Sequence, residues 1–198
     1  MPLTDTPHRQ VELFDTSLRD GLQQPDLEIS VPNAIGLLQR MSAFGVRYAE
    51  VGFAGANRFV SELAEALARA ETGEMRLALF GRSRGRATRV EDWPDLKMMV
   101  ANKDRIPAAV IVVKSRLLDV ARSLETTPEE NLRMMSETVE YLHGHGLEVL
   151  IDMEHAMDAA CGRRENGIAG SADEILKSRD YVFEMVDLCV SQGVSRIV

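Results

Sequence analysis

A run of ten residues near the N-terminus combines the side chains that could bind and polarise an anionic substrate. Phe14–Gln23 reads FDTSLRDGLQ and carries two carboxylates, one arginine and one amide. Arginine keeps its proton at neutral pH, so it is a dependable partner for a carboxylate or a developing oxyanion. A carboxylate beside a divalent cation stays ionised and can coordinate it. These residue types therefore indicate an anion-binding or metal-binding site.

The run begins inside an apolar segment and so lies where a buried strand gives way to a loop. Further short apolar or β-branched segments predict strands, and longer amphipathic segments between them predict helices. The expected strands cover residues 11–18, 48–53, 76–81, 108–114, 147–153 and 195–198, and the expected helices cover residues 32–44, 59–70, 95–102, 128–142 and 181–192.

This alternation predicts an α/β fold with a parallel sheet and right-handed crossovers. Either a doubly wound open sheet or a (β/α)8 barrel satisfies the pattern, although the first strand lacks the GxGxxG typical of dinucleotide folds. In both architectures ligands bind at the carboxyl ends of the strands. The FDTSLRDGLQ run is therefore expected on the ligand-binding face.

The composition excludes several classes of protein. With 198 residues, 45% hydrophobic and 27% charged, the chain is expected to form one globular core. A formal net charge of -8 argues against nucleic acid as a partner, and no apolar run approaches the ~20 residues that cross a membrane. Two cysteines without metal-type spacing favour a cytoplasmic location. Residues 1–10 are expected to be a flexible leader, and residues 11–198 the folded part.

Asp15–Gln23 resembles the signature of the metal-dependent aldolase-like TIM barrels. This family includes the isopropylmalate, homocitrate and citramalate synthases and hydroxymethylglutaryl-CoA lyase. Other segments are similar to the same family, and most of them to its citramalate-synthase-like branch; they cover residues 48–57, 80–84, 94–97, 114–115, 124–132 and 151–155. The resemblance implies the N-terminal portion of a TIM-barrel catalytic domain over residues 11–198, with about five and a half of the eight units in this chain.

The resemblance also implies an activity. The family's synthases are acyltransferases of amino-acid biosynthesis that condense acetyl-CoA with an α-keto acid such as pyruvate in a Claisen-type reaction. A divalent metal (Mg, Mn or Zn) acts as Lewis acid on the keto group. The expected partners are these two small molecules, in a homo-oligomer. One alternative is a hydroxymethylglutaryl-CoA-lyase-like reaction, because Leu22 gives the motif a form common in those lyases. Another is a non-catalytic truncated barrel that acts through oligomerisation.

Roles for single residues follow from the positions of the family motif. Asp20 would be a metal ligand, and Arg19 would steady the keto acid and the growing negative charge. Glu154 would do acid–base work at the end of the fifth strand. The substrate-binding residues implied by the resemblance are Asp15, Gln23, Glu50 and Asn57.

The sequence departs from the family pattern at several points. Ala34 stands where the family usually carries a lysine, and the family's His-x-His and asparagine metal ligands belong to strands that these 198 residues do not include. Asp20 alone is not expected to hold a hard cation tightly. His143 and His145 have ligand-like spacing, but their expected place at the end of a helix, on the bottom of a barrel, favours a capping role.

One basic segment follows the third expected strand. Arg82, Arg84, Arg86 and Arg89 lie on the side where ligands are expected. These arginines could attract carboxylates or the phosphates of CoA, or they could belong to a solvated loop. The sequence leaves both interpretations open.

Overall fold

The sheet of this protein is curled and entirely parallel. The computed structural model describes residues 11–55, 58–161 and 171–198. Its strands pair in the order of the chain: β1 (Leu13–Asp15), β2 (Val46–Phe53), β3 (Arg76–Arg82), β4 (Ala108–Lys114), β5 (Glu148–Glu154) and β6 (Arg196–Ile197). A doubly wound sheet reverses its strand order, whereas here every crossover advances in the same direction. The predicted TIM-barrel-type fold is therefore confirmed as a half-barrel.

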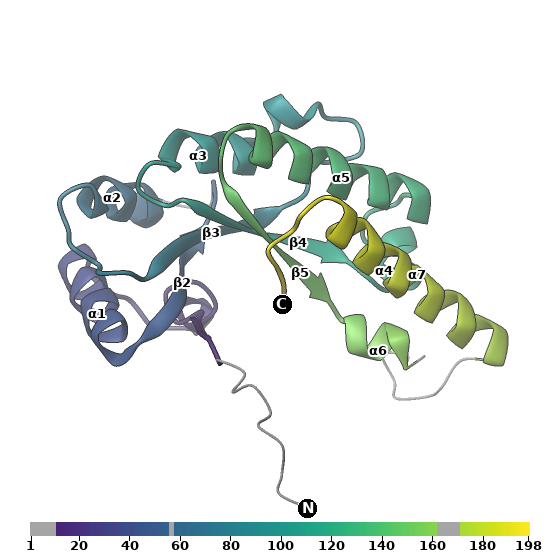
Figure 1. The fold of residues 1–198 in the computed structure, drawn as a ribbon, viewed down its shortest axis with the longest axis horizontal. Helices are drawn as coiled ribbons and strands as arrows, with labels where there is room; N and C mark the ends of the chain where they lie inside the picture. Colours follow the sequence, from purple (N-terminus) through teal and green to yellow (C-terminus); the bar gives the residue numbers. More distant parts are fainter. Residues whose placement is uncertain (1–10, 56–57, 162–170) are drawn as a thin grey trace, which may run out of the picture.

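Helices cover the convex side of this half-barrel, and the strands line its inner side (Figure 1). The described helices are α1 (Val31–Phe44), α2 (Arg58–Leu67), α3 (Pro94–Asn102), α4 (Leu117–Arg122), α5 (Pro128–Gly144), α6 (Ala156–Ala160) and α7 (Ala172–Ser191), with 3-10 turns η1 (Gly21–Gln23) and η2 (Val90–Asp92). No helix in the described ranges is long and apolar enough to cross a membrane.

Alternation along the strands produces two apolar layers. One set of side chains forms the large core between sheet and helices, with Leu79, Ile111 and Ile151 fully buried in it. The other set points to the inside of the curl and forms a smaller cluster of Phe14, Tyr48, Phe53, Ala78, Phe80, Ala108, Val110, Val112 and Leu150. The polar residues near the strand ends continue this inner set, so they face the hollow of the half-barrel.

Local capping signals set the limits of the long helices. Ser30 accepts a hydrogen bond from the backbone N–H of Asn33, and Gly45 ends α1 in the left-handed conformation, so the predicted helix over residues 32–44 is confirmed within one residue. Thr127 accepts from the N–H of Glu130 and begins α5 as predicted. A capping box between Ser171 and Glu174 starts α7 nine residues before the predicted position.

Other predicted limits are wrong for identifiable reasons. The first strand was expected to reach Leu18 but ends at Asp15, because the Asp15 carboxylate accepts from the N–H of Ser17 and turns the chain. The short helices α4 and α6 were not predicted, since five or six residues are too few to show a helical period.

A polar network closes the N-terminal end of the half-barrel. Glu148 accepts a hydrogen bond from the Tyr48 hydroxyl at 2.7 Å and pairs with Arg76 at 2.8 Å and Arg196 at 3.1 Å. Arg196, on β6, also pairs at 2.6 Å with Glu12, which directly precedes β1. The two outer strands of the sheet are thus linked through side chains.

Gly52 lets β2 pass close to α2, which leads to a prediction about stability. Its φ of +145° is rarely adopted by other residues, and an added Cβ would lie 2.5 Å from Val60 Cγ2. We expect Gly52→Ala to lower the free energy of unfolding by about 1–3 kcal/mol, measured by urea denaturation. Gly36→Ala in α1 is the matched control, because nothing lies within 4 Å of its added Cβ. It should raise stability by about 0.5–1 kcal/mol, and equal effects of the two changes would contradict this account.

Candidate active site

A pocket of about 580 Å³ opens at the carboxyl ends of the strands. Its volume lies in the range of small-molecule sites. Residues of β2 to β5, of the segments that follow β1, β3 and β4, and of α5 line it: Arg19, Asp20, Gln23, Phe53, Phe80, Arg82, Ser83, Arg84, Gly85, Arg86, Trp93, Val112, Lys114, Ser123, Leu124, Met134, Asp152 and Glu154. Cationic and anionic groups share this wall with aromatic rings, so the pocket suits a small polar ligand.

Arg19 is the central cation of the pocket. Its Nε donates to Glu50 Oε2 at 2.5 Å, and its Nη1 donates to Asp20 Oδ1 at 3.0 Å. The guanidinium also lies over the Phe80 ring, 4.1 Å from the centroid. The Arg19 side chain is only 14% exposed, whereas that of Asp20 is 62% exposed. Arg19 is therefore held in one orientation by a carboxylate behind it and a ring beneath it.

The turn after β1 places Arg19 and Asp20. The backbone N–H groups of Arg19 and Asp20 donate to the Thr16 carbonyl at 3.0 and 2.8 Å. Asp15 stabilises the start of this turn, because its carboxylate accepts from the N–H and the hydroxyl of Ser17 at 2.8 and 3.1 Å. The Asp15 carboxylate does not line the pocket. Its predicted role in substrate binding stays a prediction.

Glu50 lies behind the pocket wall rather than on it. Its side chain is 1% exposed, and burial raises its pKa above the ordinary value for glutamate. The hydrogen bond and charge of Arg19 oppose this increase, and the charges of Asp152 and Asp20 add to it. The structure therefore brings Glu50 to the predicted site as the partner that positions Arg19.

The ends of β4 and β5 form the other side of the pocket. Lys114 pairs with the Glu154 carboxylate, which is 35% exposed, and the Ser115 hydroxyl donates to the Glu154 carbonyl. Asp152 lies two residues before Glu154 on β5 and also faces the pocket. Burial raises the pKa of Asp152; the charge of Arg19 opposes this increase, and the charge of Glu154 adds to it. Two carboxyl groups in different surroundings can serve as proton donor and acceptor. The buried Asn131 fixes this edge by donating to the Lys114 carbonyl at 2.8 Å.

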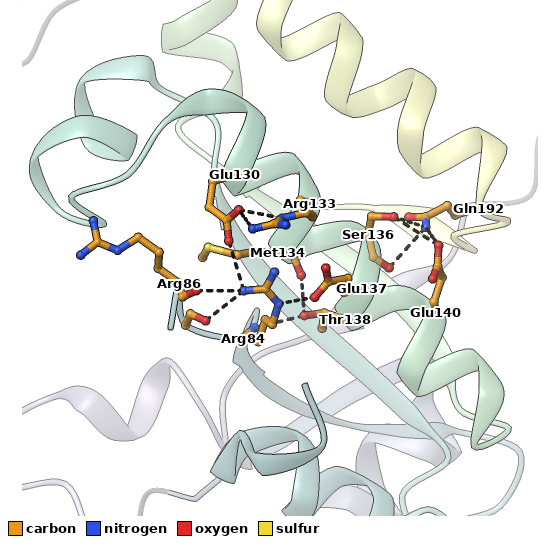
Figure 2. Close-up of polar contacts among 11 residues, drawn as sticks. Arg84, Arg86, Glu130, Arg133, Met134, Ser136, Glu137, Thr138, Glu140 and Gln192 are labelled. Atoms are coloured by element: carbon orange, nitrogen blue, oxygen red, sulfur yellow. Dashed lines mark hydrogen bonds and ion pairs between the residues drawn. The ribbon is translucent and has the colours of Figure 1, made fainter. Parts of the chain in front are cut away.

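The basic segment after β3 is largely internally paired. Figure 2 shows the buried Arg84 pointing into α5, where its Nε donates to Glu137 at 2.5 Å and its Nη1 approaches Glu130 at 3.3 Å. The Arg86 side chain extends away from this cluster (Figure 2) and donates to the Glu125 carbonyl. Arg89 pairs with Glu91. The interpretation of this segment as a solvated loop is therefore wrong for Arg84, which is buried and attaches the loop to α5 through its ion pairs.

The structure gathers most of the predicted site residues. Arg19, Asp20, Gln23 and Glu154 line one pocket, with Glu50 behind it. Asn57 lies outside the described residues, as does the predicted leader over residues 1–10. Sequence reasoning did not single out Asp152, Phe53, Phe80 and Trp93. The period of two along β5 could have found Asp152, because it shares the inner face with Glu154.

The described carboxylates do not by themselves form a metal centre. Asp20 is exposed and available, but one of its oxygens already pairs with Arg19. No group of three or more His, Cys, Asp or Glu side chains that could hold a metal occurs within the described residues. A hard cation takes about six oxygen ligands, of which Asp20 would supply one, so the other ligands would have to come from outside these residues. The assignment of Asp20 as a metal ligand stays a prediction.

His143 and His145 lie at the end of α5, on the side opposite the pocket, as expected. His145 follows α5 and its N–H donates to the carbonyls of Tyr141 and Leu142. Its ring nitrogen Nδ1 lies 2.8 Å from the Tyr141 carbonyl. These contacts are those of a helix terminus.

The fold and the pocket define a TIM-barrel-type α/β domain with its polar groups at the carboxyl ends of the strands. The family model described as HMGL-like matches residues 10–194. The chain belongs to this HMGL-like family, and the family resemblance of the sequence is confirmed.

Similar proteins include synthases and a lyase. The (R)-citramalate synthase of Aquifex aeolicus is 34% identical over 149 residues, which are 75% of this chain and 28% of that protein. That of Sulfolobus acidocaldarius is 28% identical over 190 residues, covering 96% and 33%. The solved hydroxymethylglutaryl-CoA lyase of Pseudomonas aeruginosa matches with a TM-score of 0.65 at 16% identity, covering 95% of this chain and 56% of that one, which shows the fold. The chain spans a third or less of the length of these two synthases.

The buried Glu50 leads to a prediction about pH. A raised pKa means that the fold favours the protonated carboxyl group more than the unfolded chain does. This stabilisation is complete below the ordinary pKa of glutamate and is lost as the pH rises through the raised pKa. We expect the stability of the wild type, relative to Glu50→Gln, to fall as the pH rises above the ordinary pKa of glutamate, measured by urea denaturation.

Glu62→Gln is the control for this comparison. Glu62 pairs with Arg58 on the surface of α2, so the change removes one negative charge without touching the pocket. If the pH profile of Glu50→Gln followed that of Glu62→Gln, the buried carboxyl group would not be responsible for the effect.

Proposed function

We propose that this chain provides part of the active site of a 2-hydroxy-acid synthase that condenses acetyl-CoA with an α-keto acid. The observation that carries the proposal is the fixed orientation of Arg19. The buried Glu50 holds its guanidinium in a pocket that also contains Asp152 and Glu154. Similarity to the (R)-citramalate synthases supports the transferase reaction and makes pyruvate the first acceptor to test.

In this proposal Arg19 binds the carboxylate of the keto acid and stabilises negative charge on its keto oxygen. A guanidinium suits both tasks because it cannot lose its proton and presents several N–H donors. Nε and Nη1 already bond Glu50 and Asp20, whereas Nη2 makes no hydrogen bond within the described residues and is left for a ligand in the pocket that Arg19 lines. Such preorganised donors lower the barrier because they need no reorientation when charge develops.

Glu154 and Asp152 carry the proton transfers. One carboxylate accepts a proton from the methyl group of acetyl-CoA, and the resulting enolate carbon forms a bond to the keto carbon. The keto oxygen takes up a proton and becomes a hydroxyl group. Water then cleaves the thioester, which releases CoA and a 2-hydroxy-dicarboxylate. Lys114 positions Glu154 through their ion pair. In the family a divalent metal would polarise the keto group, and Asp20 is the residue proposed to contact it.

The proposal predicts CoA release that depends on Arg19. The purified chain is mixed with acetyl-CoA, pyruvate and Mg²⁺ or Mn²⁺, and the free thiol of CoA is measured. We expect Arg19→Met to lower the rate by about 10²–10³-fold, the usual effect of removing a donor to a developing oxyanion. Arg58→Met is the matched control, because Arg58 is an exposed arginine on α2 outside the pocket.

Other results would point away from this reaction. Cleavage of hydroxymethylglutaryl-CoA without condensation would favour the lyase-like alternative. An inactive oligomer without bound metal would contradict the synthase proposal and would favour the non-catalytic alternative. CoA release that does not depend on pyruvate would contradict pyruvate as the acceptor.

A further inference from the structure

A second arginine in the pocket, like Arg19, is held in place by a buried carboxylate. Arg82, at the end of β3, donates through Nε and Nη2 to the two carboxylate oxygens of Asp95 at 3.0 and 3.1 Å. The Asp95 side chain is 1% exposed and also accepts from the Arg82 backbone N–H at 3.0 Å. Like Glu50 behind Arg19, this carboxylate lies behind the cation and fixes its orientation.

Arg82 also resembles Arg19 in its contacts with aromatic rings. The Arg82 guanidinium lies 5.3 Å from the centroid of Phe53 and 5.5 Å from that of Trp93. Phe53 contacts Phe80, the ring beneath Arg19, with centroids 5.6 Å apart. The two arginines therefore lie over neighbouring rings on one wall of the same pocket. Arg82 differs in one respect, because its side chain is 57% exposed although its Nε and Nη2 are paired.

The pairing with Asp95 does not account for all the donors of Arg82, which lines the pocket. Nη1 of Arg82 makes no hydrogen bond to another part of the chain that the structure describes. An exposed, oriented guanidinium with free donors is suited to a planar anion such as a carboxylate. Two other cations of the pocket are neutralised by carboxylates, since Lys114 pairs with Glu154 and Arg84 with Glu130 and Glu137. Arg86 donates to the Glu125 carbonyl and, among the described residues, lacks a buried carboxylate that fixes its orientation as Asp95 fixes that of Arg82.

We propose that Arg82 forms a second anion subsite, which binds the distal carboxylate of a dicarboxylic α-keto acid while Arg19 binds the group next to the keto carbon. This inference rests on the proposed function, because it assigns the acceptor of that reaction to the dicarboxylic class. A monocarboxylic acid such as pyruvate would leave the subsite without a ligand group.

The only tryptophan of the chain gives a readout that needs no turnover. Trp93 lies beside Arg82, so a ligand at the subsite should change its fluorescence. The probes are 2-oxoglutarate, pyruvate and coenzyme A, each titrated separately into the full chain. We expect the wild type to bind 2-oxoglutarate more tightly than pyruvate. Arg82→Met should weaken 2-oxoglutarate binding about tenfold or more and leave pyruvate binding unchanged.

Two further variants separate charge from folding. Arg82→Lys keeps the charge but not the two-pronged geometry, so it should weaken 2-oxoglutarate binding less than Arg82→Met does. It also serves if Arg82→Met fails to fold, and affinities equal to those of the wild type would then overturn the proposal. Arg89→Met is the matched control, because Arg89 lies close to Trp93 in the sequence but does not line the pocket. We expect it to bind every probe as the wild type does.

The outcomes that overturn the proposal are distinct from those that overturn the function. No fluorescence change with any probe, no preference for 2-oxoglutarate, or equal weakening of 2-oxoglutarate and pyruvate would each refute the subsite. Weakened coenzyme A binding with unchanged 2-oxoglutarate binding would assign Arg82 to a phosphate and refute the carboxylate. CoA release with pyruvate but no preference for 2-oxoglutarate would refute only the subsite. A preference for 2-oxoglutarate without CoA release from acetyl-CoA in the presence of either keto acid would refute only the synthase reaction.

Discussion

The contact between Arg19 and Glu50 is the interaction on which the rest of the pocket depends. A carboxylate that is 1% exposed would be strongly disfavoured without a cation, because burial removes its hydration. Arg19 supplies that cation from the loop after β1, and the Phe80 ring supports its flat face. The conformation of the loop, the burial of Glu50 and the direction of Arg19 are therefore set by one interaction, which joins β1, β2 and β3.

Similar pairs between an arginine and a buried or half-buried carboxylate recur along the carboxyl edge of the sheet. Arg82 is held by Asp95, and Arg84 is held by Glu137 and Glu130. Each pair fixes a strand end or a loop to a neighbouring helix and leaves a cation at or near the pocket wall. This explains how an acidic chain with a net charge of -8 presents basic side chains where an anionic ligand is proposed to bind. The charge that balances them lies behind the wall, in buried or half-buried carboxylates.

Much of this arrangement could be predicted from the sequence, because strand ends in a parallel sheet meet at one edge. Arg19, Asp20 and Glu154 were expected on that edge and lie there. Contacts between distant segments were beyond reach, since nothing in the local pattern indicates that Glu50 lies behind Arg19 or that Arg84 turns inward to α5. The early end of β1 was missed for a related reason. A hydrogen bond from the Ser17 N–H to Asp15 outweighed the apolar pattern that favoured a longer strand.

The link between Glu12 and Arg196 has a consequence for the order of folding. These residues are 184 positions apart, and β6 adds only two residues to the sheet. Contacts so distant in sequence form after the intervening chain has been ordered, because closing a long flexible loop is entropically unfavourable. The pairing of β2 to β5 can build up between consecutive neighbours, whereas the salt bridge between the outer strands can form only on a sheet that is already curled. We therefore expect this salt bridge to form late in folding and to stabilise the curvature of the half-barrel once the strands have paired.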